Sequence, residues 1–98
     1  MKIIFSHASE RDLKGIKDYI STDNPRVASK VVLRIVRHIR ITLSTNPYSG
    51  RLSDSCSNDI RELIIPNLPY LACYTVSEDR ISIIRIFHQS MKYWERLK

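Results

Sequence analysis

The sequence predicts an α+β fold in which a strand and two helices precede three antiparallel strands. In the first half, apolar residues recur at helical spacing, while the second half holds three short runs rich in β-branched and aromatic residues, separated by turn residues. A chain of 98 residues can enclose one modest hydrophobic core. We therefore expect a single domain, residues 1–98, with a helical hairpin packed on one face of the sheet.

The N-terminal residues predict a strand and a first helix. Lys2 to Phe5 is a short apolar run that suits a strand joining the sheet. Ser6 and Ser9 both offer N-cap oxygens, and the spacing predicts a first helix from about Ser9 to Ile20. The apolar positions of this helix are Leu13, Ile16 and Ile20.

The next segment predicts a longer helix. Asn24 can act as an N-cap, and Pro25 suits the first helical position because its missing N–H is no loss there. An apolar stripe then predicts a helix from Pro25 to about Ser44, paired with the first helix as an αα-hairpin. On another face of this helix basic residues succeed one another at steps of four, four and three: Arg26, Lys30, Arg34 and Arg37.

The second half predicts a three-stranded meander. Residues 46–50 contain Pro and Gly and break the helix, and Ser53 to Asp59 is a polar loop. The strand candidates that follow are joined by short turns, as in an antiparallel meander. They are Ile60 to Ile65, Tyr70 to Val76 and Arg80 to His88.

The charge is positive and unevenly placed. The formal net charge is +6, and no acidic residue occurs between Asn24 and Ser53. Such a field suits an acidic protein segment, a phosphate backbone or an anionic surface, and charge alone does not choose among them.

The composition predicts neither a metal site nor a cofactor. Cys56 and Cys73 lack the spacing of a redox or metal-binding pair, the 3 histidines are scattered, and there is no glycine-rich phosphate loop. The apolar N-terminal run is too short for a signal peptide, and no later run reaches transmembrane length. We expect a soluble cytoplasmic protein with no membrane partner.

Several local phrases, in order, resemble the ParE/RelE toxin superfamily of type II toxin–antitoxin systems. The resemblance covers nearly the whole chain and is closer to the ParE-type members; its strength lies in the order and spacing of the phrases. They are Asp12-Leu13, Ile16 and Tyr19-Ile20, then Asn24-Pro25 with Ala28, then Leu43, Pro47 and Gly50-Arg51, the segment RELIIPNLPYLACYTVSEDRISIIRIFH from Arg61 to His88, and Trp94.

The resemblance implies a toxin that a cognate antitoxin neutralises. ParE-type toxins poison DNA gyrase without being enzymes, whereas RelE-type toxins cleave messenger RNA in the ribosome. This chain has Leu71 where RelE-type members carry a basic residue, and Arg61 alone where they tend to show paired lysines. We therefore expect a gyrase inhibitor that meets DNA only through gyrase or the antitoxin, with a ribosome-dependent mRNA endonuclease as the alternative.

The expected target-binding surface combines two strands with an aromatic and basic tail. Arg61 and Arg85 lie on strands predicted to be neighbours, where they form either one cationic spot or local salt bridges, for instance to Glu62 or Asp59. The target-binding candidates are Arg61, Arg85, His88, Lys92, Tyr93, Trp94 and Arg96. The endonuclease alternative would use Arg61, Arg85, His88 and Tyr93 as catalytic groups.

Antitoxins of this superfamily are often acidic chains that wrap their toxins, which gives the basic helix face a possible partner. The same face could equally be a solvated surface, and Trp94 could close the core instead of binding a target. The expected antitoxin-binding residues are Arg26, Lys30, Arg34, Arg37, Tyr70 and Tyr74.

Overall fold

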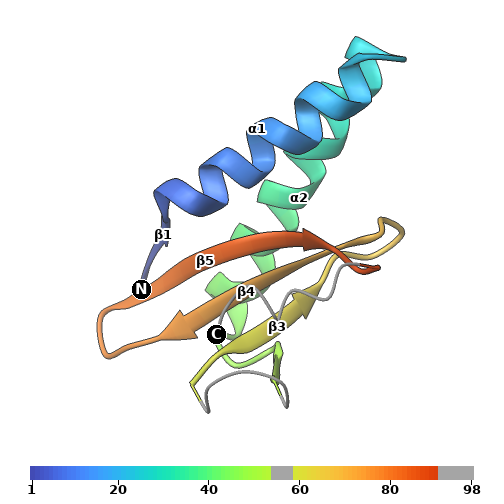
Figure 1. Ribbon diagram of the computed structural model, residues 1–98. Helices are drawn as coiled ribbons and strands as arrows, with labels where there is room; N and C mark the ends of the chain where they lie inside the picture. The colour runs from blue at the N-terminus through green and yellow to red at the C-terminus, as the bar shows by residue number, and fades with distance from the viewer. Residues whose placement is uncertain (54–58, 91–98) are drawn as a thin grey trace.

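The computed structural model describes residues 1–53 and 59–90 of the chain (Figure 1). Two helices pack on a five-stranded sheet with the strand order β1-β5-β4-β3-β2. The elements are β1 (Lys2–Phe5), α1 (His7–Ser21), α2 (Pro25–Thr45), β2 (Arg51–Leu52), β3 (Arg61–Ile64), β4 (Tyr70–Val76) and β5 (Arg80–His88). The predicted α+β fold class is confirmed.

The sheet is mixed. β1 pairs in parallel with β5, so that Lys2 lies opposite Arg80, and the remaining neighbours are antiparallel. The first strand therefore joins the sheet as expected. Because β4 lies between β3 and β5, the prediction that Arg61 and Arg85 occupy neighbouring strands is wrong.

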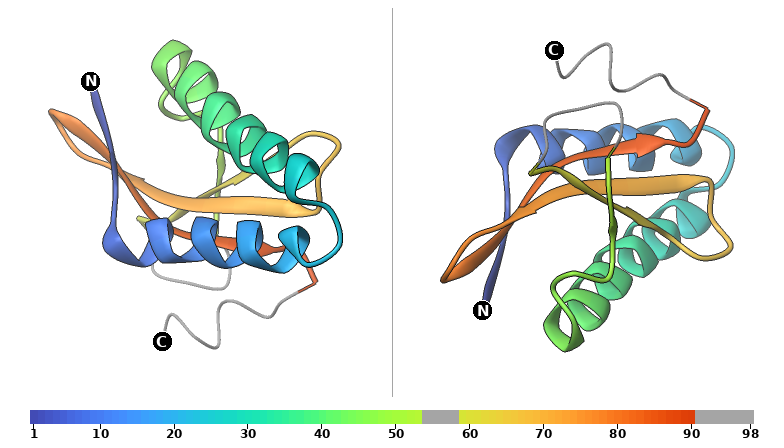
Figure 2. Two further views of the ribbon diagram at one scale, coloured as in Figure 1. Left: turned by 90° about the horizontal axis from the view of Figure 1, so that it is seen from above. Right: turned by 90° about the horizontal axis from the view of Figure 1, so that it is seen from below.

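The helices begin at side-chain caps. α1 starts at His7, two residues before the predicted start, because Ser6 and not Ser9 is the N-cap: the Ser6 Oγ accepts the Ser9 N–H at 3.0 Å. Asn24 caps α2 by accepting the Val27 N–H at 3.3 Å. Seen from above, α1 runs along β5 and α2 crosses it at an angle (Figure 2). The two helices pack against each other, and apolar residues of both contact the same core cluster.

The core lies between α2 and one face of the sheet. Ile35, Ile39 and Leu43 of α2 are fully buried there with alternate residues of β4 and β5. Tyr74 is fully buried in this cluster, and Tyr70 is 8% exposed. Both side chains belong to the core of the free protein, and their predicted contact with an antitoxin stays a prediction.

In the described residues, no helix combines the length and the apolar character needed to cross a membrane.

Candidate functional site

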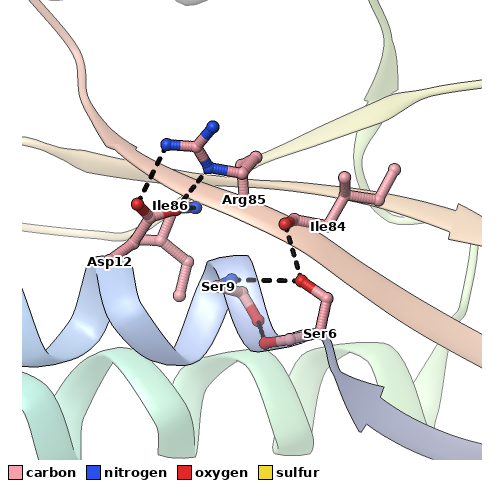
Figure 3. Close-up of polar contacts among 6 residues, drawn as sticks. All are labelled: Ser6, Ser9, Asp12, Ile84, Arg85 and Ile86. Carbon is pink, nitrogen blue, oxygen red and sulfur yellow. Dashed lines mark hydrogen bonds and ion pairs between the residues drawn. The ribbon is translucent and has the colours of Figure 1, made fainter.

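The junction between α1 and β5 is held by Asp12. Its carboxylate accepts hydrogen bonds from the Arg85 Nε at 2.8 Å and the Arg85 Nη2 at 3.0 Å, and also from the Ile86 N–H at 2.9 Å (Figure 3). Both side chains are largely shielded, with 16% of Asp12 and 26% of Arg85 exposed. These hydrogen bonds raise the pKa of Arg85, which stays charged.

A second side chain closes the same strand edge. Ser6 donates its hydroxyl to the Ile84 carbonyl at 2.8 Å (Figure 3). β1 pairs with β5 only as far as Ile83. Beyond that point the side chains of Ser6 and Asp12 form hydrogen bonds with the exposed-edge backbone groups of β5, the Ile84 carbonyl and the Ile86 N–H.

Next to this junction a groove of about 550 Å³ lies between α1 and β5. Gly15 lies on its α1 side, and a Cβ added there would meet no atom within 4 Å. Tyr19, one turn further on, is 80% exposed. The groove is lined by Arg11, Asp12, Gly15, Ile16, Tyr19, Tyr70, Arg85, Ile86, Phe87, His88 and Ser90. Its mixture of aromatic, aliphatic and polar groups suits a peptide partner.

His88 stands in this groove at the end of β5. Its ring meets the Tyr70 ring edge-on, with centroids 5.6 Å apart and planes at 86°. The Ser90 N–H donates to His88 Nδ1 at 3.1 Å, and the Ser90 hydroxyl lies 2.7 Å from the same nitrogen. Burial, and secondarily Tyr19, raises the pKa of Tyr70, so its hydroxyl stays protonated at neutral pH.

A second polar cluster ties the chain after α2 to the sheet. The Tyr74 hydroxyl accepts the Gly50 N–H at 2.8 Å and donates to the Pro47 carbonyl at 2.9 Å. Arg61 Nη1 donates to the Gly50 carbonyl at 2.8 Å, and its guanidinium lies 4.9 Å from the centroid of the Tyr48 ring. The segment that the sequence predicted to be a plain break after the helix is therefore fixed by buried contacts.

β2 lies where the sequence predicted only a break and a loop. Its first residue, Arg51, lies opposite Glu62 of β3, and Arg51 Nε reaches Glu62 Oε1 at 3.1 Å. Glu62 is 5% exposed. The expected local partner of Arg61 is thus wrong, because Glu62 is bonded to Arg51 and Arg61 turns to the Gly50 carbonyl.

The two arginines expected to form one cationic spot are separated. Arg61 lies opposite Tyr74 and Arg85 lies opposite Cys73. Because successive residues of a strand point to opposite faces, the two guanidinium groups project from opposite faces of the sheet. The other residues predicted for target binding, Lys92, Tyr93, Trp94 and Arg96, lie outside the described residues.

The four basic residues predicted on the second helix are all exposed. Arg26, Lys30, Arg34 and Arg37 share the outer face of α2 and line no part of the α1/β5 groove. Asp12 and Gly15 are site residues that the sequence patterns did not predict. A signal for Gly15 was present, because a glycine inside a helix is unfavourable unless its missing side chain is useful.

Comparison with known proteins places this geometry among toxins. The model of the family described as "ParE toxin of type II toxin-antitoxin system, parDE" matches residues 3–93. Toxin RelE2 of Caulobacter vibrioides is 30% identical over 87 residues, which are 89% of this chain and 93% of that protein. The protein Y4kP of Sinorhizobium fredii is 34% identical over 83 residues, 85% of this chain and 82% of its own.

Among solved structures, a chain from the chromosomal ParDE toxin–antitoxin system of P. aeruginosa superposes with a TM-score of 0.78 and 28% sequence identity. The match covers 90% of this chain and 95% of that one. The fold and the sequence thus point to the same group of proteins.

Proposed function

Because the chain belongs to the ParE family of toxins from type II toxin–antitoxin systems, we propose that it acts in the cytoplasm by inhibiting DNA gyrase, without cutting RNA. The observation that carries this proposal is the separation of Arg61 and Arg85 on opposite faces of the sheet. Each guanidinium is also engaged, Arg61 by the Gly50 carbonyl and Arg85 by the Asp12 carboxylate.

RNA cleavage needs groups that deprotonate the 2′-hydroxyl, stabilise the charged transition state and protonate the leaving oxygen, all converging on one phosphate. Arg61 and Arg85 cannot serve one phosphate from opposite faces. Among the described members of the predicted catalytic set, His88 is the one candidate left for proton transfer. The charge of Arg85 is already neutralised by Asp12. This arrangement suits binding better than phosphodiester chemistry.

We further propose that the antitoxin, the partner that the toxin–antitoxin family implies, neutralises the toxin by placing an apolar segment in the α1/β5 groove. Gly15 leaves open space in the middle of α1, so a partner backbone can approach the helix closely there. Tyr19 is a large exposed anchor beside that space.

A supercoiling assay with purified gyrase tests the proposed activity. At an excess of the full chain we expect loss of supercoiling and accumulation of cleaved DNA. Intact supercoiling with no cleaved DNA at toxin excess would remove the proposal.

The likeness to Toxin RelE2 favours one second candidate, ribosome-dependent cleavage of messenger RNA. In a purified translation system, that activity would give cuts in the ribosomal A site, visible by primer extension. His88→Ala would abolish these cuts, since an exposed histidine is the one remaining acid or base of the predicted set in the described residues.

A further inference from the structure

The outer face of α2 carries unpaired positive charge. We call Arg26, Lys30, Arg34 and Arg37 the α2 stripe; all four are exposed, and α2 contains no acidic residue. The ion pairs within 4.0 Å among residues 1–53 and 59–90 all involve other residues. The charge of the stripe is therefore not balanced by carboxylates of the described chain.

This arrangement opposes helix formation. Like charges three or four residues apart on a helix repel one another, and the stripe contains three such successive steps. No acidic residue occupies the first turn of α2 either. An anionic partner lying along the helix would remove this repulsion, so the face is suited to a binding role that the fold itself does not need.

One end of the stripe opens into a small basic cleft. The cleft has a volume of about 190 Å³ and lies between α2 and the turn joining β3 to β4. Arg34 Nη2 donates to the Pro66 carbonyl at 3.4 Å, which holds the side chain over the turn. The cleft is lined by Arg34, Arg37, His38, Ile65, Pro66 and Asn67. Its ionisable side chains are all nitrogen donors or bases, the set that recognises a group with only acceptor oxygens.

We propose that the α2 stripe and this cleft bind the phosphate backbone of duplex DNA. Arg26 and Arg37 are 11 positions apart, which is about 16 Å along a helix rising 1.5 Å per residue. Along the duplex axis, that length equals the rise of about five phosphates of one strand at 3.4 Å each. This inference rests on the proposed function in one respect: gyrase, as the target, would bring duplex DNA next to the bound toxin.

An acidic protein segment is the competing partner, and it was the sequence-based expectation for these four residues. DNA is favoured because the charges are spread evenly along the helix and the cleft offers donors to single oxygens. Leu33 and Ile41 are also exposed on α2, at 48% and 67%, and a protein helix would use them; they are therefore the residues whose replacement separates the two partners in the binding test. The apolar lining that an antitoxin prefers lies instead in the α1/β5 groove, which shares no residue with the stripe.

The test measures binding of the full chain to a short labelled duplex by fluorescence anisotropy, from about 50 to 200 mM salt. Arg34→Gln with Arg37→Gln should weaken binding and reduce the slope of log K against log salt by about 2, since each phosphate contact contributes about 0.9. Lys14→Gln with Lys17→Gln removes the same charge from exposed positions of α1 and should leave the slope unchanged. Circular dichroism confirms that both variants fold.

Equal effects of the two pairs would overturn the inference, because net charge and not this face would then explain binding. Tighter binding to a single-stranded RNA of the same length would overturn the choice of duplex DNA. Leu33→Ser with Ile41→Ser should not change DNA binding; if it abolishes antitoxin binding while Arg34→Gln with Arg37→Gln leaves DNA binding intact, the face belongs to the antitoxin.

The two proposals fail separately. Direct DNA binding through α2 without gyrase inhibition leaves the inference standing and removes the proposed function. Gyrase inhibition without any DNA binding by the free chain removes the inference alone.

Discussion

Asp12 of α1 and Arg85 of β5 are joined by two hydrogen bonds of 2.8 and 3.0 Å, although they stand 73 positions apart in the sequence. The same carboxylate also accepts the Ile86 N–H. One side chain therefore fixes the wall of the α1/β5 groove and satisfies an edge group of the sheet.

Asp12→Ala should destabilise the fold markedly. It leaves a partly buried guanidinium and a backbone N–H without their acceptor, and we expect a loss of about 2–3 kcal/mol in the free energy of unfolding, measured by urea denaturation. Asp18→Ala is the matched control, because it breaks the exposed Lys14–Asp18 pair and should cost less than about 0.5 kcal/mol. Equal losses in the two variants would mean that the Asp12 contacts add nothing special.

The two glycines should respond in opposite directions to alanine. At Gly50 a Cβ would lie 2.6 Å from the Glu62 carbonyl oxygen and 2.7 Å from the Tyr74 ring, so Gly50→Ala should destabilise by about 1–3 kcal/mol. At Gly15 the space is open, and Gly15→Ala should stabilise the helix by up to about 1 kcal/mol. Thermal unfolding of the two variants compares them directly, and a stabilised Gly50→Ala would contradict the close packing described here.

A larger residue at Gly15 should weaken binding of the antitoxin without destabilising the toxin. Gly15→Leu fills the α1 side of the groove without a clash inside the chain, so the toxin should fold and inhibit its target while binding the antitoxin at least tenfold more weakly, a difference of about 1.4 kcal/mol. Lys17→Leu places the same side chain on α1 outside the groove lining and should bind normally. Titration calorimetry with the purified antitoxin measures both, and unchanged affinity in Gly15→Leu would exclude the groove as the docking site.

The buried hydroxyl of Tyr74 should make the free energy of unfolding fall at high pH. Burial raises the pKa of its hydroxyl above the ordinary 10.0, although the Gly50 N–H and Arg61 partly oppose this. The folded protein then holds the proton more tightly than the unfolded chain, so the stabilisation is complete below about pH 10 and is lost as the pH rises through the raised pKa. Urea denaturation across this range should show a shallower alkaline decline in Tyr74→Phe, which lacks the titrating group.

Local patterns in the sequence predicted most of the elements. The predicted second helix, Pro25 to Ser44, differs from α2 by one residue at its end, because capping by Asn24 and the apolar stripe are local properties of the chain. α1 began earlier than expected because two serines compete for the cap, and the one that also reaches the Ile84 carbonyl is used. β2 has only two residues, too few to produce an alternating pattern.

The arrangement of the site residues depends on strand order, which no local pattern contains. Arg61 and Arg85 were expected together because their strands follow closely in the sequence, but β4 separates them and the register puts them on opposite faces. The sequence places Asp12 in a motif that resembles the toxin superfamily, but its role as an acceptor for β5 follows only from the path of α1 along that strand.

The parallel pairing of β1 with β5 has a consequence for synthesis of the protein. The Ser6 hydroxyl and the Ile84 carbonyl that it meets are separated by 78 positions, so β1 has no partner in the sheet until β5 has left the ribosome. Contacts between such distant residues slow folding because the long intervening loop must first be closed. The newly made chain therefore cannot complete its sheet until β5 has been synthesised and can reach β1.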